Sequence, residues 1–413
     1  MSPRHFCFVT TFYPPFHYGG DAISTFRLVQ ALAAKGHRVD VIHSEDAYRL
    51  QGGREPDGQV DHHPNVRVHG LRSRAPRLAP LWSHQTGGIG LYGPQLRRVL
   101  RDAQPDVIHF HNVSLMGAPG VLSLGNAVKL YTPHEYWLVC PTHVLFAFGR
   151  EACMQKRCLR CTLHARRPPQ LWRLGNWRKR ALDHIDCFVM LSEWALERHR
   201  QEGIERPMVC IPHAVEPPAE LEPADPYDDP YFLFVGRLLR LKGVHELIEI
   251  FRGFRRARLV IAGEGEDRAD FERAADGLDH VEFVGHVEGH ALSRLYRNAV
   301  AVLMPSLCFE VSPLVPREAF GHGTPVIARD LGALPEVVEA PEIGWTFRRS
   351  DECVAAMNQL LDDPSLREER GGRAYRSAAE WTPERQLEEY LGLVEELVQA
   401  RSSVSDGDVE ARR

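Results

Sequence analysis

Short apolar runs alternate with helical patterns along most of this chain of 413 residues. The first run lies within residues 4–15 and stops at two prolines. The glycine pair Gly19 and Gly20 follows. Asp21 can cap the helix that begins after this pair, and a second β-rich run occupies residues 39–43. Strand, glycine loop, helix and strand form a βαβ unit, which requires a parallel sheet with right-handed crossovers.

The same pattern recurs in both halves of the chain. The first half adds apolar runs at residues 106–112, 128–135, 186–193 and 208–214, and each ends in polar residues. The second half has runs at residues 231–237, 257–265, 281–287, 301–306 and 325–330. Polar residues at the carboxyl ends of parallel strands are expected where a sheet lines a crevice. The sequence therefore predicts an α/β protein with two Rossmann-like halves.

Composition suggests the domain boundaries. Residues 215–230 are rich in proline and acidic residues and have no periodicity, so we interpret them as a linker. The linker separates a first domain at residues 1–214 from a second domain at residues 231–381. Residues 382–400 form a strongly periodic helix, and we interpret residues 401–413 as a disordered tail. Residues 45–65 and 72–93, rich in Gly, Pro and Arg, are expected to include mobile loops.

Composition also limits the cellular setting and the partners. No apolar run reaches the ~20 residues that span a bilayer, and the first run starts too close to Met1 for a signal peptide. We therefore expect a cytoplasmic protein, whose nine cysteines are reduced, buried or metal-bound rather than disulfide-paired. The net charge of −5 gives no global field that would attract nucleic acid, so no such partner is expected.

Two glutamates mark an informative stretch at residues 308–328. We interpret Ser312 as an N-cap and Pro313 as the first residue of a helix. The helix N-terminus would then present free N–H groups to an anion. Glu310 precedes the helix and Glu318 lies on its second turn, where carboxylates can accept hydrogen bonds from sugar or ribose hydroxyls. The alternative is an exposed helix with ordinary surface glutamates.

Three further features follow predicted strands. Arg237 and Lys242 share a short loop where they could neutralise a diphosphate, or simply form a solvated basic loop. Gly19 and Gly20 would let backbone N–H groups approach a phosphate, although such a pair is often only a turn. They lack the G-x-G-x-x-G spacing, which argues against a dinucleotide cofactor. His134 ends a strand at the expected crevice, where it is either functional or structural.

Four cysteines, Cys140, Cys153, Cys158 and Cys161, lie close together in the sequence. Their number matches the ligand set of a structural zinc site, although the spacing is not a paired C-x-x-C set. The alternative is a group of free or redox-labile thiols in an insertion. A metal at this place would be structural and would hold a loop near His134.

A basic segment with tryptophans follows at residues 166–183. It mixes arginines with Trp172 and Trp177. We expect a solvated helix that buries its tryptophans, because no long amphipathic run accompanies them. Contact with an anionic membrane surface or with an acceptor is the alternative.

Taken together, several segments resemble a known family. They are "YPPFHYGGDAISTFRLVQALAAKGHRVDVI", "FVGRLLRLKG", "LVIAGEGED", "FVGHV" and "EVSPLVPRE" followed by "AFGHGTPVIA". Their order and spacing resemble the retaining glycosyltransferases of family 4, which have the GT-B fold, and the resemblance covers nearly the whole chain. It implies two Rossmann-like domains that face each other across a cleft. The first would take the acceptor and the second the nucleotide-sugar donor, and the last long helix would cross back onto the first domain.

The resemblance also implies roles for single residues. Arg237 and Lys242 would hold the donor diphosphate, and Glu318 would bind the ribose hydroxyls. Glu310 would meet the transferred sugar, and His134 matches the active-site histidine of the family. The further substrate-binding residues that the resemblance implies lie in loops and at a helix start around the cleft: Gly19, Gly20, Gly265, Val287, Ser312, Pro313 and Leu314.

The sequence departs from the family pattern at three places. His213-Ala214 stands where many relatives have Asn-Gly, Pro316 and Arg317 replace small or apolar residues, and the cysteine-rich insertion occurs in only some relatives. Because the first half selects the acceptor, the acceptor stays open.

The expected reaction is transfer of a sugar from a UDP- or GDP-type donor to a hydroxyl of a glycan, lipid or small molecule. No Asp-x-Asp stands where a metal-dependent transferase would need one, so we expect no cofactor for catalysis, and at most peripheral membrane contact. A nucleotide-sugar epimerase or a phosphorylase on the same fold is one alternative. A catalytically silent nucleotide-sugar-binding protein is another.

Overall fold

Two parallel β-sheets organise the chain, as the sequence predicts. The computed structural model describes residues 2–56, 60–218, 227, 229–338 and 342–410. The first sheet has seven strands in the order β3-β2-β1-β4-β5-β8-β9, and all neighbours are parallel. Its strands are β1 (His5–Val9), β2 (Arg38–Ser44), β3 (Val66–Leu71), β4 (Val107–Phe110), β5 (Val128–Tyr131), β8 (Cys187–Met190) and β9 (Met208–Cys210).

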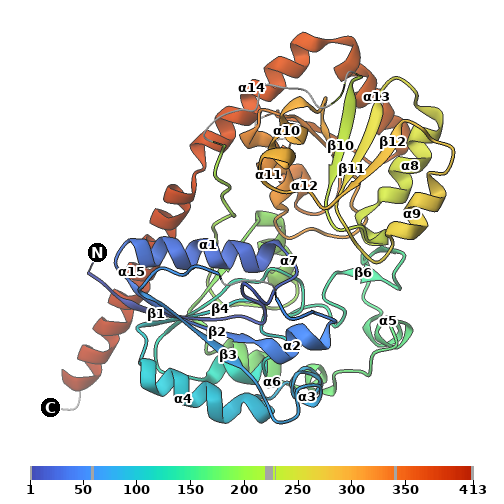
Figure 1. Cartoon of the computed structure of the whole chain (residues 1–413). Helices are drawn as coiled ribbons and strands as arrows, with labels where there is room; N and C mark the ends of the chain where they lie inside the picture. Colours follow the sequence, from blue (N-terminus) through green and yellow to red (C-terminus); the bar gives the residue numbers. More distant parts are fainter. Residues whose placement is uncertain (1, 57–59, 219–226, 228, 339–341, 411–413) are drawn as a thin grey trace.

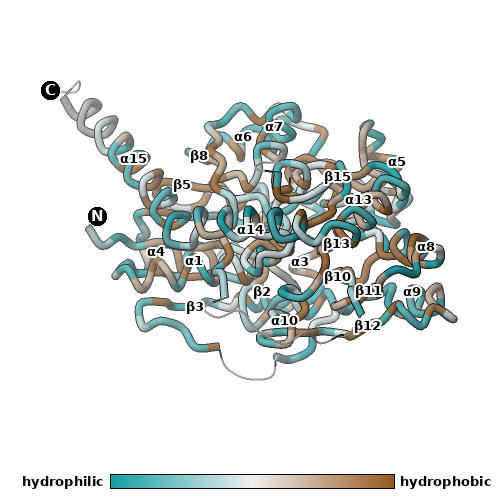
Figure 2. Tube along the Cα trace, turned by 90° about the horizontal axis from the view of Figure 1, so that it is seen from above, coloured by the Kyte–Doolittle hydropathy of each residue, from teal (hydrophilic) through white to brown (hydrophobic). Residues whose placement is uncertain are grey.

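The second sheet has six strands in the order β12-β11-β10-β13-β14-β15, again with parallel neighbours. They are β10 (Tyr231–Val235), β11 (Arg258–Ala262), β12 (Val281–Gly285), β13 (Val302–Met304), β14 (Val326–Arg329) and β15 (Trp345–Phe347). The first strand of each half thus lies in the middle of its sheet. Figure 1 shows the two domains one above the other, and strands such as β10 and β11 are hydrophobic in Figure 2.

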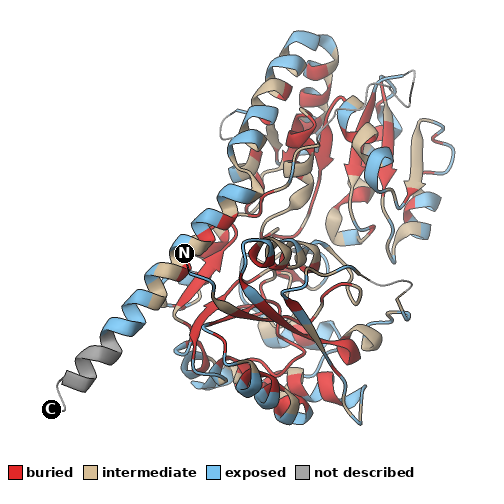
Figure 3. Cartoon of the chain, turned by 60° about the vertical axis from the view of Figure 1, so that its left-hand side comes forward, coloured by how far each residue is buried: buried red, intermediate tan, exposed pale blue. Residues whose placement is uncertain are grey.

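Helices flank both sheets and pack their buried sides against them (Figure 3). The first domain has α1 (Gly20–Ala34), α2 (Glu45–Leu50), α3 (Leu78–Thr86), α4 (Gly93–Ala103), α5 (Cys158–His164), α6 (Trp177–Leu182) and α7 (Glu193–Gln201). The second has α8 (Val244–Gly253), α9 (Arg268–Ala274), α10 (Gly289–Asn298), α11 (Leu314–Gly321), α12 (Leu334–Val338), α13 (Ser350–Asp362) and α14 (Pro364–Glu380). Single 3₁₀ turns are η1 (Gly90–Tyr92), η2 (Gly120–Ser123), η3 (Leu171–Leu174) and η4 (Arg240–Lys242).

Each sheet is buried on both faces, which explains why its strands read as continuous apolar runs. In β1, Phe6 and Phe8 join one core cluster, whereas Cys7 and Val9 join the cluster on the other face. The alternation follows from the two-residue period of a strand.

The last helix, α15 (Pro383–Glu410), crosses from the second domain to the first. Tyr390 packs in the core beside β1 and its hydroxyl lies 3.0 Å from Nδ1 of His109. Arg4 forms a salt bridge of 2.6 Å with Glu395. The helix continues to Glu410, whereas the sequence predicts a disordered tail from residue 401, and residues 411–413 lie outside the described chain.

Some local expectations need correction. Residues 45–65 and 72–93, which are expected to include mobile loops, contain the helices α2 and α3. The sheet-edge strands β3 and β15 and the small two-stranded sheet of β6 (Phe146–Ala147) and β7 (Glu151–Ala152) were not predicted. Most of the predicted linker, residues 219–226 and 228, lies outside the described residues. Within the described residues, no helix is both long and apolar enough to cross a membrane.

Candidate active site

A cleft of about 710 Å³ separates the two domains at the carboxyl ends of their strands. All twelve of the predicted catalytic and substrate-binding residues line it: Gly19, Gly20, His134, Arg237, Lys242, Gly265, Val287, Glu310, Ser312, Pro313, Leu314 and Glu318. The volume is of the size that holds a small-molecule ligand. The two halves of the chain therefore build one site.

Lys242 and Glu310 form an ion pair inside this cleft. Nζ of Lys242 lies 2.6 Å from Oε1 of Glu310, and the hydroxyl of Ser306 donates to the same oxygen at 2.7 Å. Burial would lower the pKa of Lys242, but the attraction of Glu310 outweighs it and the pKa lies above its ordinary value. Lys242 therefore stays positive and is held in place at one wall of the cleft, while Arg237 is exposed toward the opening.

The start of helix α11 differs by one residue from the prediction. The helix begins at Leu314 with Pro313 as the N-cap residue in an extended conformation, and no side chain caps it. The Ser312 hydroxyl is buried without a hydrogen-bond partner among the described residues, so the predicted N-cap role of Ser312 is wrong. The first residues of α11, Leu314 and Val315, still line the cleft, and a Cβ on Gly20 would lie 2.9 Å from Leu314 Cδ1. The glycine thus allows helix α1 to approach α11 across the domain boundary.

Glu318 is oriented by a tyrosine that the sequence did not reveal. The hydroxyl of Tyr296 on α10 donates to Oε2 of Glu318 at 2.7 Å. Burial, together with the nearby carboxylate, raises the pKa of Tyr296 well above its ordinary value, so this hydroxyl keeps its proton. One oxygen of Glu318 is therefore fixed, and its carboxylate faces the cleft as an acceptor.

Four neighbouring histidine rings run from the cleft into the first domain: His213, His134, His111 and His109. The ring centroids are 5.2, 5.0 and 4.2 Å apart in that order. Nε2 of His134 lies 2.7 Å from Nδ1 of His111. Burial lowers the pKa of all four, and that of His109 to about 3. These imidazoles are therefore neutral at pH 7. His213, which the sequence marks only as a departure from the family pattern, also lines the cleft.

The buried histidines predict a loss of stability in mild acid. Below the unfolded pKa of about 6.5 the unfolded chain takes up protons that the folded chain does not, so stability falls as the pH falls. We expect each such histidine to lower the free energy of unfolding by about 1.4 kcal/mol between pH 7.5 and 5.5. Urea unfolding of the wild type and of His213→Asn measures this, and the variant should have the shallower pH dependence. His286→Asn is the control because His286 is exposed, and equal slopes for His213→Asn and the wild type would contradict the prediction.

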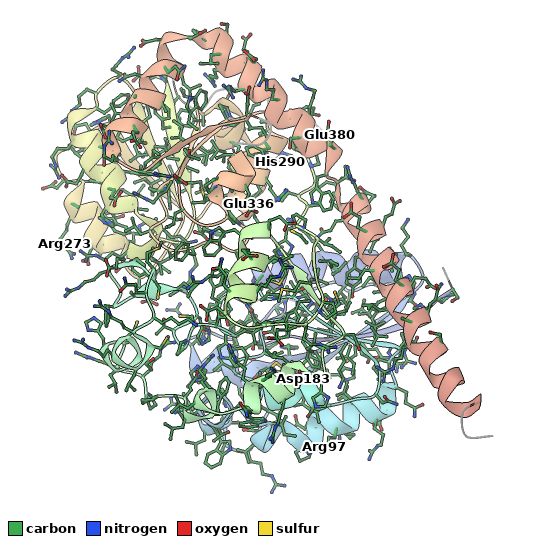
Figure 4. The ribbon with its side chains drawn as sticks, turned by 180° about the vertical axis from the view of Figure 1, so that it is seen from behind. Arg97, Asp183, Arg273, His290, Glu336 and Glu380 are labelled. Atoms are coloured by element: carbon green, nitrogen blue, oxygen red, sulfur yellow. The ribbon has the colours of Figure 1, made fainter. Side chains whose placement is uncertain are left out.

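Contacts between the domains also surround the site. The Tyr136 hydroxyl donates to the carbonyl of Glu310 at 3.0 Å, and the Ser192 hydroxyl donates to the carbonyl of Val311 at 2.7 Å. Glu336 accepts hydrogen bonds from the backbone N–H groups at the start of α7, and Figure 4 labels it at this junction. No local sequence signal identifies these residues, because their partners lie more than a hundred positions away.

The four clustered cysteines line one small cavity of about 20 Å³, roughly the space of one water molecule. Their thiols are free, and N–H of Phe148 donates to Sγ of Cys161 at 3.4 Å. No three His, Cys, Asp or Glu side chains of the described chain are placed as a metal-binding group. The structural zinc therefore stays a prediction for metal analysis of the purified protein.

Solved structures share this fold over nearly the whole chain. Sucrose-phosphate synthase from Thermosynechococcus elongatus aligns with a TM-score of 0.73 and 20% identity, covering 96% of this chain and 100% of that chain. The Anabaena protein HepE in complex with UDP-glucose aligns with a TM-score of 0.64 and 16% identity, covering 97% and 100%. The fold is that of the GT-B glycosyltransferases, as predicted.

Sequence matches identify the family. The sequence model described as "Glycosyltransferase Family 4" matches residues 18–218, and the one described as "Glycosyl transferases group 1" matches residues 221–377. The chain belongs to glycosyltransferase family 4, and it is a glycosyltransferase.

Several curated proteins are similar to this chain. Glycogen synthase of Mycobacterium tuberculosis is 28% identical over 88% of this chain and 87% of its own length. A GDP-mannose-dependent alpha-mannosyltransferase of Mycolicibacterium smegmatis is 27% identical over 92% and 94%. An uncharacterized glycosyltransferase of Methanocaldococcus jannaschii is 35% identical, but the match spans 34% of this chain and 38% of that protein.

Proposed function

We propose that the protein is a retaining glycosyltransferase that transfers a sugar from a UDP- or GDP-sugar to an acceptor hydroxyl. One observation carries the proposal: two cations, Arg237 and Lys242, and two carboxylates, Glu310 and Glu318, face one cleft beside the start of helix α11. Cations and helix N–H groups suit a diphosphate, and carboxylates suit hydroxyls. The names of the similar proteins, with GDP-mannose in one and UDP-glucose in the other, support this donor class.

In the proposed reaction, the bond between the anomeric carbon and the diphosphate oxygen breaks while the acceptor oxygen bonds to the same carbon. The electron pair of the broken bond goes to the diphosphate, and the acceptor proton passes to a phosphate oxygen on the same face. Lys242, Arg237 and the N–H groups of α11 would stabilise the charge that develops on the diphosphate. Glu310, held by Lys242 and Ser306, would accept hydrogen bonds from the sugar.

Replacing Glu318 by Gln tests the donor site. We expect the Kd for the nucleoside diphosphate to rise about 10- to 100-fold, because a charged acceptor of ribose hydroxyls is lost. Titration calorimetry measures this on the folded protein. The matched control is Glu380→Gln, since Glu380 is exposed on α14 away from the cleft (Figure 4). Unchanged affinity in Glu318→Gln would refute the assignment.

A thermal-shift panel distinguishes the donors. A ligand that binds only the folded state raises the melting temperature, so UDP, GDP, ADP and their sugars can be ranked directly. We expect UDP or GDP, with its sugar, to give the largest rise. Product formation with an acceptor, and no epimer of the donor without one, would separate transfer from epimerisation.

A further inference from the structure

Large apolar side chains are exposed almost entirely within one stretch of the first domain's sequence. Among the described residues, eleven of them are exposed, and ten lie between Leu78 and Trp177 in the sequence. Tyr375 on α14 is the remaining one. Single exposed apolar residues are common and need no explanation, whereas a concentration of them marks an interaction surface.

Helix α3 turns its apolar face outward. Its buried residues, Ala79, Pro80 and Ser83, are small. Its large residues, Leu78, Leu81 and Trp82, are 65, 51 and 60% exposed. Their spacing of three and four residues places them on one side of the helix. A surface helix normally does the reverse and packs its large apolar face on the core.

The turn η3 and helix α6 extend this surface. The indole N–H of Trp172 donates to the carbonyl of His84 at 3.3 Å, and the side-chain amide of Gln170 donates to the same oxygen at 2.9 Å. These bonds hold η3 against the end of α3, while Leu171 and Leu174 are 70 and 85% exposed. Figure 1 shows α3 and α6 at the end of the first domain that faces away from the second. We call Leu78, Leu81, Trp82, Leu171, Leu174 and Trp177 the apolar patch.

The two segments that carry the apolar patch are strongly basic; the acidic groups beside them include Asp183, exposed at the end of α6, and Glu205, which pairs with Lys179 at 3.7 Å. Residues 72–101 contain six arginines, residues 152–182 contain nine Lys and Arg, and neither segment contains Asp or Glu. The whole chain, by contrast, has a net charge of −5. The exposed arginines of these segments include five that form no salt bridge with any described residue: Arg74, Arg77, Arg166, Arg167 and Arg180.

We infer that the apolar patch and its arginines dock the first domain on an anionic lipid bilayer. Leucine and tryptophan side chains enter the interface between headgroups and acyl chains, and arginines bind the lipid phosphates. A second copy of this chain would bring the same cations face to face, which is unfavourable. The inference goes beyond the proposed function and does not depend on it.

The apolar patch is connected to the cleft through the loop that follows His134. Arg173 of η3 donates to the carbonyl of Trp137 at 2.6 Å, and Arg178 of α6 donates to the carbonyl of Leu138 at 2.9 Å. The rings of Trp137 and Trp172 lie 5.6 Å apart. These two carbonyls belong to the loop that follows His134. A docked first domain would therefore hold its half of the cleft at a fixed position above the bilayer.

Flotation with vesicles tests the inference on the full chain. The vesicles contain either phosphatidylcholine alone or equal parts of phosphatidylcholine and phosphatidylglycerol. We expect binding to the anionic vesicles only, weakened at least about 10-fold by Trp82→Ser with Leu174→Ser. Arg166→Glu with Arg167→Glu should weaken it about 25-fold or more. The control pair is Tyr375→Ser with Arg376→Glu, exposed side chains of α14, which should bind like the wild type.

All variants should unfold in urea in one cooperative transition, as the wild type does, which shows that they fold. The inference would be overturned if the wild-type protein did not bind anionic vesicles. It would also be overturned if the control pair lost as much binding as the variants of the apolar patch and its arginines. Light scattering measures the oligomeric state and so tests whether a second copy of this chain covers the apolar patch instead. A wild-type dimer that Trp82→Ser with Leu174→Ser turns into a monomer would assign the apolar patch to a second copy and also overturn the inference.

Discussion

Replacing Lys242 by Ala is expected to lower kcat/KM about 100- to 1,000-fold, the loss typical of removing one preorganised group that stabilises transition-state charge. Lys242 is the half-buried cation of the cleft and is fixed by Glu310 at 2.6 Å. It therefore needs little rearrangement before it meets a developing negative charge. Initial rates of transfer, measured with the donor that the thermal-shift panel selects, give the value.

Two further variants make this result specific. Arg240→Ala removes an exposed cation of the same turn that does not line the cleft, and its rate should match the wild type. In Lys242→Ala, the carboxylate of Glu310 loses its cationic partner. The double variant Lys242→Met with Glu310→Gln removes this unpaired charge as well. If this double variant recovered wild-type activity, an uncompensated Glu310 would explain the loss, and the role of Lys242 at the diphosphate would be wrong.

The second large effect is expected from Gly243→Ala. Gly243 ends the turn that carries Lys242, with φ of +78°, and an added Cβ would lie 2.2 Å from the carbonyl oxygen of Pro305. The left-handed conformation alone costs an alanine about 1 kcal/mol, and the backbone clash adds to it. We expect the free energy of unfolding to fall by about 2–4 kcal/mol and transfer to be lost as the turn shifts.

A matched glycine separates these two causes. Gly277 has φ of +74°, but no atom lies within 4 Å of its added Cβ. Gly277→Ala should therefore lose only about 1 kcal/mol and keep its activity. Denaturant unfolding and initial rates of both variants provide the comparison. Equal destabilisation would mean that the contact with Pro305 does not matter.

The sequence was most informative where one local segment contains both the strand and the chemistry. The loop of Arg237 and Lys242 and the helix that carries Glu318 follow buried apolar strands directly, so their place at the sheet edge could be predicted. Tyr296 could not, because it reaches Glu318 only through the packing of α10 on α11. Tyr136 and Glu336 depend in the same way on contacts between the domains.

The elements that the sequence did not predict include strands at the edges of the two sheets. Strand β3 is only partly buried and β15 has three residues, so neither gives a continuous apolar run. Helix α3 was not predicted, because residues 72–93 are rich in Gly, Pro and Arg and the large apolar residues of the helix face outward rather than toward the core. Ser312 was assigned as an N-cap from its residue type, but Pro313 is extended and shifts the helix start beyond its reach.

The return of α15 to the first domain means that the chain passes between the domains twice, and the two passages are bonded to each other. The indole N–H of Trp381 donates to the carbonyl of Pro212, and the side chain of Gln386 accepts from N–H of Ala214. Two adjacent crossings that are hydrogen-bonded to each other form a single hinge, so we expect any relative movement of the domains to be a rotation about that line. The first domain is also discontinuous in sequence. A fragment that ended at residue 214 would lack Tyr390, which packs in its core and contacts His109.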